Sequence, residues 1–109
     1  MKKANIIKSS RDINKILNEK NCIRNKYYSI FLGKNNENTH RFAICVSKKI
    51  GNAVVRNKIK RQTKDIIDKS NLIFKRNKDY VIIVSREINT IDFKEMKKNL
   101  IDLISKCLD

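Results

Sequence analysis

Apolar and polar residues follow one another along the chain in a pattern that predicts helices at both ends and strands between them. The first helix is expected to continue to about residue 20, because Ser9 or Ser10 can cap its start. The apolar face of this helix holds Ile13, Ile16 and Leu17.

Two strand-like runs come next, "KYYSIFLG" and "RFAICVS", and the intervening "GKNNENTH" predicts that they form a hairpin. Alternation then assigns the side chains to two faces. The face expected to form the core holds Tyr28, Ile30, Leu32, Phe42, Ile44 and Val46. The other face holds Tyr27, Ser29, Phe31, Ala43 and Cys45. Two interpretations of its aromatic rings stay open, packing against a helix or stacking against bases.

The second half of the chain contains a strand and a helix with strong signals. "DYVIIVS" is a continuous apolar run, which is typical of a strand covered on both faces. "DFKEMKKNLIDLISKCL" is amphipathic and opens with a capping box formed by Asp92 and Glu95. From residue 92 to residue 109 there are four lysines and four acids, so this helix adds no net charge.

Length and charge narrow the function. The 109 residues are enough for one domain, over residues 1–109, and a net charge of +15 favours a polyanionic partner, with nucleic acid first. An anionic membrane is the rival partner, but the chain has no long apolar run. "MKKANIIKSS" begins like a signal peptide with an apolar core of only Ala4 to Ile7, so we expect a cytoplasmic protein that does not bind membranes.

Residues with catalytic or metal-binding chemistry are few and scattered. Cys22, Cys45 and Cys107 form no C-x-x-C pair, so we interpret them as structural thiols rather than zinc ligands. His40 has no acid or nucleophile patterned around it, which argues against a role in proton transfer. We therefore predict no catalytic residue, no metal site and no organic cofactor in this chain.

The stretch "KKIGNAVVRNKIKRQTK" carries the strongest functional signal. At 100° per residue, Val55, Ile59 and Ile66 form one apolar stripe of a helix expected over residues 53–69. Nearly opposite lies an arc of polar side chains. It consists of Arg56, Asn57, Lys60, Arg61 and Lys64. Gly51 is expected to permit a tight turn before the helix, where free amides can add an anion site.

The arc differs from an ordinary solvated helix face, in which Glu and Lys are mixed at i,i+4 spacing. From Asn38 to Lys64 the chain has eight basic residues and no acid. Like charges at Arg56, Lys60 and Lys64 repel by a few tenths of a kcal/mol per pair, a penalty that a bound polyanion removes. The arc therefore predicts a nucleic-acid-binding surface.

The longer stretch "VSKKIGNAVVRNKIKRQTKDI" resembles the signature of the protein component of bacterial ribonuclease P. The matching pattern is Ser-Lys-Lys, Gly-x-Ala-Val and then Arg-Asn-x-x-Lys-Arg. It is formed by Ser47, Lys48, Lys49, Gly51, Ala53, Val54, Arg56, Asn57, Lys60 and Arg61. The predicted order of helices and strands agrees with that family along essentially the whole chain.

This resemblance implies an α+β, single-domain, two-layer sandwich. Its sheet would have about four strands, mostly antiparallel, and one of them would be a short strand near Cys22 to Asn25. The implied chain order is α-β-β-β-α-β-α, with a left-handed strand-helix-strand crossover through the basic helix. In the family, the protein assists a catalytic RNA that removes the 5′ leader of precursor tRNA. The implied partners are ribonuclease P RNA, one copy for each protein, and precursor tRNA, with Mg²⁺ held mainly by the RNA.

The resemblance also assigns residues to these two RNAs. The residues expected to contact the RNA subunit are Lys48, Lys49, Gly51, Asn52, Arg56, Asn57, Lys60 and Arg61. The residues expected to contact the leader, in a cleft between the sheet and the first helix, are Phe31, Tyr27, Lys64, Ile13 and Leu17. Family members often have aromatic residues where this chain has Ile13 and Leu17, and aliphatic side chains stack less well on bases.

Two other functions remain compatible with the sequence. A structural RNA-binding protein, such as a ribosome component, would have the same basic helix without any role in cleavage. A self-sufficient nuclease would need its own carboxylates, and the nearest to the basic arc are Asp65 and Asp68.

Overall fold

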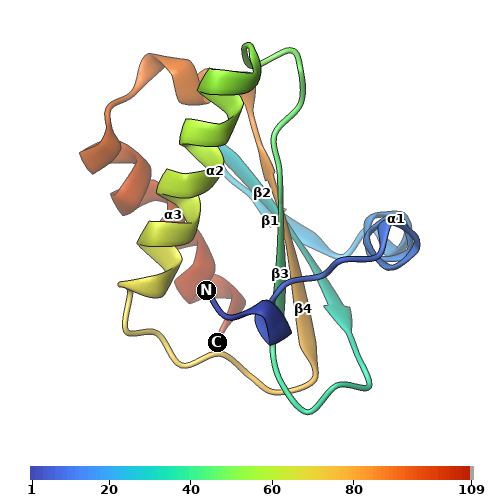
Figure 1. Cartoon of the computed structure of the whole chain (residues 1–109). Coiled ribbons are helices and arrows are strands. Elements are labelled where there is room, and N and C mark those ends of the chain that lie inside the picture. Colours follow the sequence, from blue (N-terminus) through green and yellow to red (C-terminus); the bar gives the residue numbers. More distant parts are fainter. Residues whose placement is uncertain (109) are drawn as a thin grey trace.

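The computed structural model describes residues 1–108, which form a four-stranded sheet and three α-helices (Figure 1). The elements are α1 (Ser10–Glu19), β1 (Cys22–Arg24), β2 (Tyr28–Lys34), β3 (Arg41–Cys45), α2 (Ala53–Asp68), β4 (Lys78–Val84) and α3 (Phe93–Cys107). Two short 3-10 helices, η1 (Lys3–Asn5) and η2 (Arg86–Thr90), complete the order. The α-β-β-β-α-β-α order and the short strand near Cys22 are confirmed.

The strands lie in the order β1-β2-β4-β3, so the predicted hairpin between β2 and β3 is wrong. β4 lies between them and pairs antiparallel with β2 and parallel with β3, so that Tyr80 has Leu32 on one side and Phe42 on the other. The β2–β3 loop instead crosses the start of β4, where the Asn77 amide donates to the Thr39 carbonyl. The apolar run of β4 explains this order, because a strand without polar alternation is stable only in the interior of a sheet.

α2 connects the parallel neighbours β3 and β4 by crossing one face of the sheet. In Figure 1 both strands run upward, β3 lies nearer the viewer than β4, and α2 lies to their left. A chain that passes from β3 through α2 to β4 in this arrangement turns in the left-handed sense. The resemblance implied this crossover, whereas the general rule for such units is right-handed.

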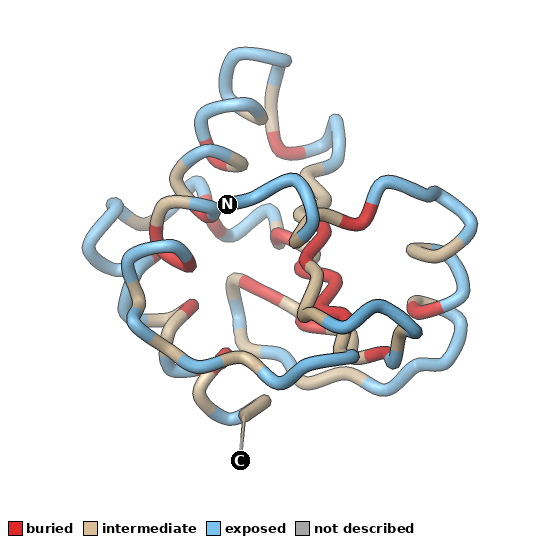
Figure 2. The backbone as a smooth tube through the Cα atoms, turned by 60° about the horizontal axis from the view of Figure 1, so that its bottom comes forward, coloured by how far each residue is buried: buried red, intermediate tan, exposed pale blue. Residues whose placement is uncertain are grey.

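The two faces of the sheet carry two apolar clusters. The larger lies between the sheet and the pair α2 and α3, and it confirms the predicted core face of β2 and β3. A smaller cluster lies on the opposite face, where α1 covers part of the sheet; its buried members are Ile7, Ile16, Ala43 and Val81. Figure 2 shows the buried residues concentrated along the sheet and on the inner turns of the helices. The two-layer sandwich therefore carries α1 as a partial third layer.

An ion pair joins the beginnings of β3 and β4. Asp79 is 1% exposed and accepts hydrogen bonds from Arg41 Nε at 2.9 Å and Arg41 Nη2 at 2.7 Å. Asn35 Nδ2 donates to the same carboxylate at 2.6 Å, and Arg41 Nη2 lies 3.9 Å from Asp12 on α1. Hydrogen bonding to Asp79 raises the pKa of Arg41, while burial opposes the rise. The pair ties the β2–β3 loop, two strands and α1 together.

α1 is capped as predicted, since the Asp12 amide donates to Ser9 Oγ at 3.3 Å. The helix then packs closely on β2 because Gly33 has no side chain. A Cβ at Gly33 would lie 2.7 Å from Ile16 Cγ1 and 3.2 Å from Ile16 Cδ1. The position of α1 over the sheet therefore depends on this glycine.

We expect Gly33→Ala to lower the free energy of unfolding by about 1–3 kcal/mol, because the added methyl must displace Ile16 or the whole of α1. Denaturant unfolding measures the loss, and Ser29→Ala in the same strand is the control. In an Ile16→Ala background the Gly33 substitution should cost markedly less, since the clashing atoms are gone. An equal cost in both backgrounds would contradict the close approach of α1 to β2.

Candidate nucleic-acid interface

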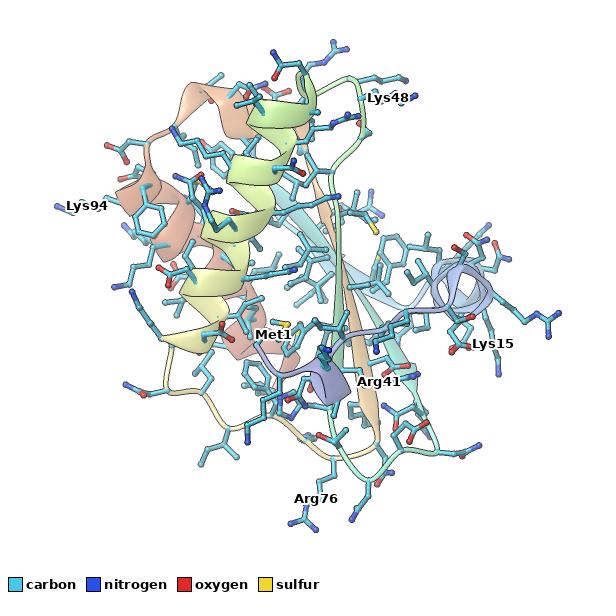
Figure 3. All side chains as sticks on the ribbon, in the orientation of Figure 1. Met1, Lys15, Arg41, Lys48, Arg76 and Lys94 are labelled. Carbon is cyan, nitrogen blue, oxygen red and sulfur yellow. The ribbon has the colours of Figure 1, made fainter. Side chains whose placement is uncertain are left out.

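The segment between β3 and α2 presents two lysines and starts the helix. Lys48 and Lys49 are exposed, and Figure 3 shows Lys48 projecting from this segment into solvent. Ile50 is buried beneath them, with its amide donating to the Ser47 carbonyl at 3.1 Å. Asn52 caps α2, because its Oδ1 accepts from the Val55 amide at 3.0 Å. Asn52 therefore has a structural role, while the two lysines are free to contact a ligand.

Gly51 is required at its position for a reason other than the one predicted. No glycine among the described residues has a positive φ, so Gly51 does not make a turn that other residues avoid. A Cβ at Gly51 would instead lie 2.8 Å from Val55 Cγ1 and 2.9 Å from Val55 Cβ. The glycine allows the connecting segment to pass close to the first turn of α2.

The buried side of α2 is rotated relative to the predicted stripe. Ile59 and Ile66 are buried as expected, but Val55 is 36% exposed and does not anchor the helix. Thr63 is 0% exposed and takes a place on the buried side, with its hydroxyl donating to the Ile59 carbonyl at 2.8 Å. Periodicity missed Thr63 because its hydroxyl is polar, although a bond within the helix satisfies it.

Three basic residues of α2 line a shallow surface depression of about 430 Å³. Four members of the predicted arc line it. They are Asn57, Lys60, Arg61 and Lys64. Arg56 is half-buried and is not among the lining residues. The depression, which we call the α2 basic surface, thus combines three positive charges with one amide.

Two acids also border the α2 basic surface, and both already have partners. Asp65 lies 3.1 Å from Lys69 Nζ, and Asp68 lies 2.7 Å from the N-terminal ammonium group. Ion pairing reduces the negative field that these carboxylates add, so the surface keeps its positive potential. A nuclease would have to use these two carboxylates, which are the nearest to the arc, but each is in an ion pair here.

The N-terminal segment also lines this surface, which the sequence did not predict. Met1 and Ile6 border the depression, and Ile6 forms a parallel bridge with Phe42 at the free edge of β3. The Ile7 amide donates to the Phe42 carbonyl at 2.9 Å. The only signal in the sequence was the adjacent pair Ile6 and Ile7 ahead of α1, which is too short to define a strand.

Lys60, in the α2 basic surface, acts electrostatically on a cysteine of β3. Cys45, on the α1 side of β3, is half-buried. Burial raises the pKa of its thiol, and the positive charge of Lys60 lowers the pKa of the same thiol. Lys60 is therefore close enough to act electrostatically on this thiol, as expected for a residue of α2, which packs against β3.

Three of the five residues predicted to contact the leader lie together. Phe31, Ile13 and Leu17 are half-buried in the cluster between α1 and the sheet, which we call the α1 apolar surface. Lys64 is on α2, across the sheet, in the α2 basic surface.

Tyr27 does not belong to the α1 apolar surface. The alternation of β2 begins only at Tyr28, and Tyr27 packs against the cluster under α2 and α3. Its amide donates to Asn25 Oδ1, and its carbonyl accepts from the Ser85 amide. The prediction that Tyr27 shares a face with Phe31 is therefore wrong, because the strand starts one residue later than the pattern indicated.

Comparison with known proteins agrees with this geometry. The sequence model of the family described as Ribonuclease P matches residues 1–108. The chain belongs to the ribonuclease P protein family. Membership places it among the protein components of a tRNA-processing ribonucleoprotein.

Ribonuclease P protein components from other bacteria match along almost their full length. That of Streptococcus gordonii is 36% identical over 104 residues, covering 95% of this chain and 87% of that protein. That of Mycoplasma mycoides is 36% identical over 107 residues, covering 97% and 98%. The RNase P protein structure from Staphylococcus aureus has a TM-score of 0.84 at 28% identity, covering 96% of each chain. The Thermotoga maritima structure has a TM-score of 0.80 at 27% identity, covering 92% of this chain and 94% of that one.

The ribonuclease P signature therefore lies on the β3–α2 segment and the first turns of α2. Within residues 1–108 no three His, Cys, Asp or Glu side chains are grouped so that they could hold a metal ion. Over the same residues, no helix has both the length and the apolar character needed to cross a membrane.

The proximity of Lys60 to Cys45 can be tested chemically. We expect Lys60→Gln to raise the pKa of the Cys45 thiol, because the variant removes the charge that lowers it. Alkylation of Cys45 below the midpoint of its pH profile should then slow in proportion to the decrease in thiolate. Mass spectrometry follows Cys45 separately from Cys22 and Cys107, whose rates should not change. An unaltered Cys45 profile would place Lys60 away from the edge of β3.

Proposed function

We propose that this protein binds the catalytic RNA of ribonuclease P and the 5′ leader of precursor tRNA, and that it assists removal of the leader. The observation that supports this most is the α2 basic surface, whose bordering acids are held in other ion pairs. Contact between its Lys and Arg side chains and RNA phosphates releases counterions and favours association. Arg61 can also present paired hydrogen bonds to a phosphate, which a lysine cannot.

In this proposal the two faces of the sheet have different ligands. The RNA subunit contacts the α2 basic surface together with Lys48 and Lys49, which lie just before the N-terminal end of α2. The leader lies on the α1 apolar surface, where Phe31 offers a ring and Ile13 and Leu17 offer aliphatic contact. Lys60 belongs to the α2 basic surface, where its ammonium group can contact phosphates of the RNA subunit.

The chemistry of cleavage is assigned to the RNA subunit. Mg²⁺ bound by RNA would activate the attacking water and stabilise the leaving oxygen. The protein's contribution is electrostatic and positional, because its cations reduce repulsion between two RNAs and its α1 face orients the leader. We place one protein on one RNA, in the cytoplasm.

Reconstitution tests the proposal directly. We expect the protein to stimulate leader removal by a bacterial ribonuclease P RNA at low Mg²⁺, where RNA alone is slow, because protein cations replace part of the divalent screening. Gel analysis of precursor tRNA cleavage measures the stimulation. Absence of stimulation, combined with sedimentation of the protein with ribosomes, would favour a structural RNA-binding protein instead. Cleavage by protein alone would indicate a nuclease.

The salt dependence of binding tests the α2 basic surface. Arg61→Ala should weaken binding to ribonuclease P RNA and flatten the plot of log affinity against log salt by about 0.7–0.9, because one phosphate is no longer neutralised. Lys97→Ala, an exposed lysine on α3, is the matched control and should leave the slope unchanged. An unchanged slope for Arg61→Ala would mean that its guanidinium does not contact phosphate.

A further inference from the structure

A second basic depression, of about 440 Å³, lies beside the C-terminal end of β2. Its lysines come from four different segments: α1, the end of β2, the α2–β4 loop and the start of β4. They are Lys15, Lys34, Lys75 and Lys78, and we call this depression the lysine pocket. The single acid in its lining is Glu19.

These lysines are held near one another without compensating partners. Lys34 and Lys78 are directly opposite in the antiparallel pairing of β2 with β4, an arrangement that destabilises a sheet when both charges have the same sign. None of the four ammonium groups forms an ion pair within residues 1–108. Repulsion of this kind is relieved when an anion with several charges binds.

The lysine pocket is separate from the α2 basic surface, and the two share no lining residue. β2 runs antiparallel to β4 and β4 runs parallel to β3, so Lys34 lies at the sheet end opposite Lys48. Figure 3 agrees, with Lys15 on α1 at the right and Lys48 at the top. The lysine pocket must therefore bind either a separate ligand or a different part of a ligand that also contacts another surface.

The pocket is continuous with the α1 apolar surface. Gly33 lines the pocket and lies directly under Ile16, while Phe31 is two residues earlier on the same face of β2. Pairing of β1 with β2 ends at Phe31, so the outer edge of Gly33 and Lys34 is not covered by β1. Lys34 and Lys78 share the other face with Leu32 and Tyr80, which also line the pocket. A polymer lying over Phe31 can therefore enter the pocket beside Gly33 and pass around this uncovered edge toward the two lysines.

We propose that the lysine pocket binds backbone phosphates of leader nucleotides upstream of those in contact with Phe31. This inference rests on the proposed function, since it extends the same leader along β2. A single RNA strand matches both the position of the pocket beside the α1 apolar surface and the positive charge of its lysines, because the strand carries a phosphate at every nucleotide. The pocket then increases affinity for precursor tRNAs with long leaders, with little dependence on leader sequence.

The experiment compares two precursor tRNAs bound to the reconstituted holoenzyme, one with a leader that ends within the α1 apolar surface and one several nucleotides longer. For the long leader, Lys34→Gln with Lys75→Gln should weaken binding by up to about five-fold for each lysine, as expected for exposed ion pairs. The salt slope should fall by about 0.7 for each phosphate that is no longer neutralised. For the short leader, affinity should equal that of the unmodified protein.

Lys97→Gln with Lys98→Gln on α3 removes the same charge at exposed positions outside the pocket and should not distinguish the two leaders. Equal losses of affinity for both leaders would overturn the inference and assign the pocket to the RNA subunit or the tRNA body. Unchanged affinity for the long leader would also overturn it. If the unmodified protein does not stimulate cleavage of either precursor, the proposed function itself fails. Circular dichroism confirms that the variants fold.

Discussion

The burial of β4 on both faces is the constraint on which the rest of the structure depends. Tyr80, Val81 and Ile82 are each at most 2% exposed, and removing each such side chain from water contributes about 1.5–3 kcal/mol. Their side chains alternate between the faces, so the sheet must be covered by α2 and α3 on one side and by α1 on the other. Each covering layer then carries one of the surfaces assigned to RNA.

Local sequence patterns determine the helices and strands, but not how the strands pair or how the helices are rotated. Caps at Ser9 and Asp92, the central run of β4 and the basic arc of α2 are predicted, because each depends only on spacing along the chain. The strand order is not predicted, because β2 and β3 are neighbours in the sequence and this favours a hairpin between them. In the structure the apolar strand β4 lies between β2 and β3. The rotation of α2 depends on what covers it, which is why Val55 is exposed and Thr63 is buried. The lysine pocket could not be predicted, because its lysines come from four separate segments that only the folded chain brings together.

The distribution of acids explains how a chain with a net charge of +15 both folds and keeps its basic surfaces open. The buried carboxylate of Asp79 holds Arg41, and loss of one partner from such a pair costs about 3–5 kcal/mol. Through Asp12, the same arginine also approaches α1, the layer that lies over Phe31. The arginine that Asp79 holds thus also interacts with the layer that carries the apolar surface.

A rigid apolar surface between two basic depressions favours an extended ligand over a compact one. The lysine pocket meets it at the end of β2 through Gly33, whereas the α2 basic surface lies across the sheet. A leader strand that followed β2 would contact apolar side chains at Phe31 and then the cations of the lysine pocket, while the RNA subunit would contact the α2 basic surface. Because the protein surfaces are already positioned by β4 and by the Arg41–Asp79 pair, the cost of ordering falls mainly on the RNA.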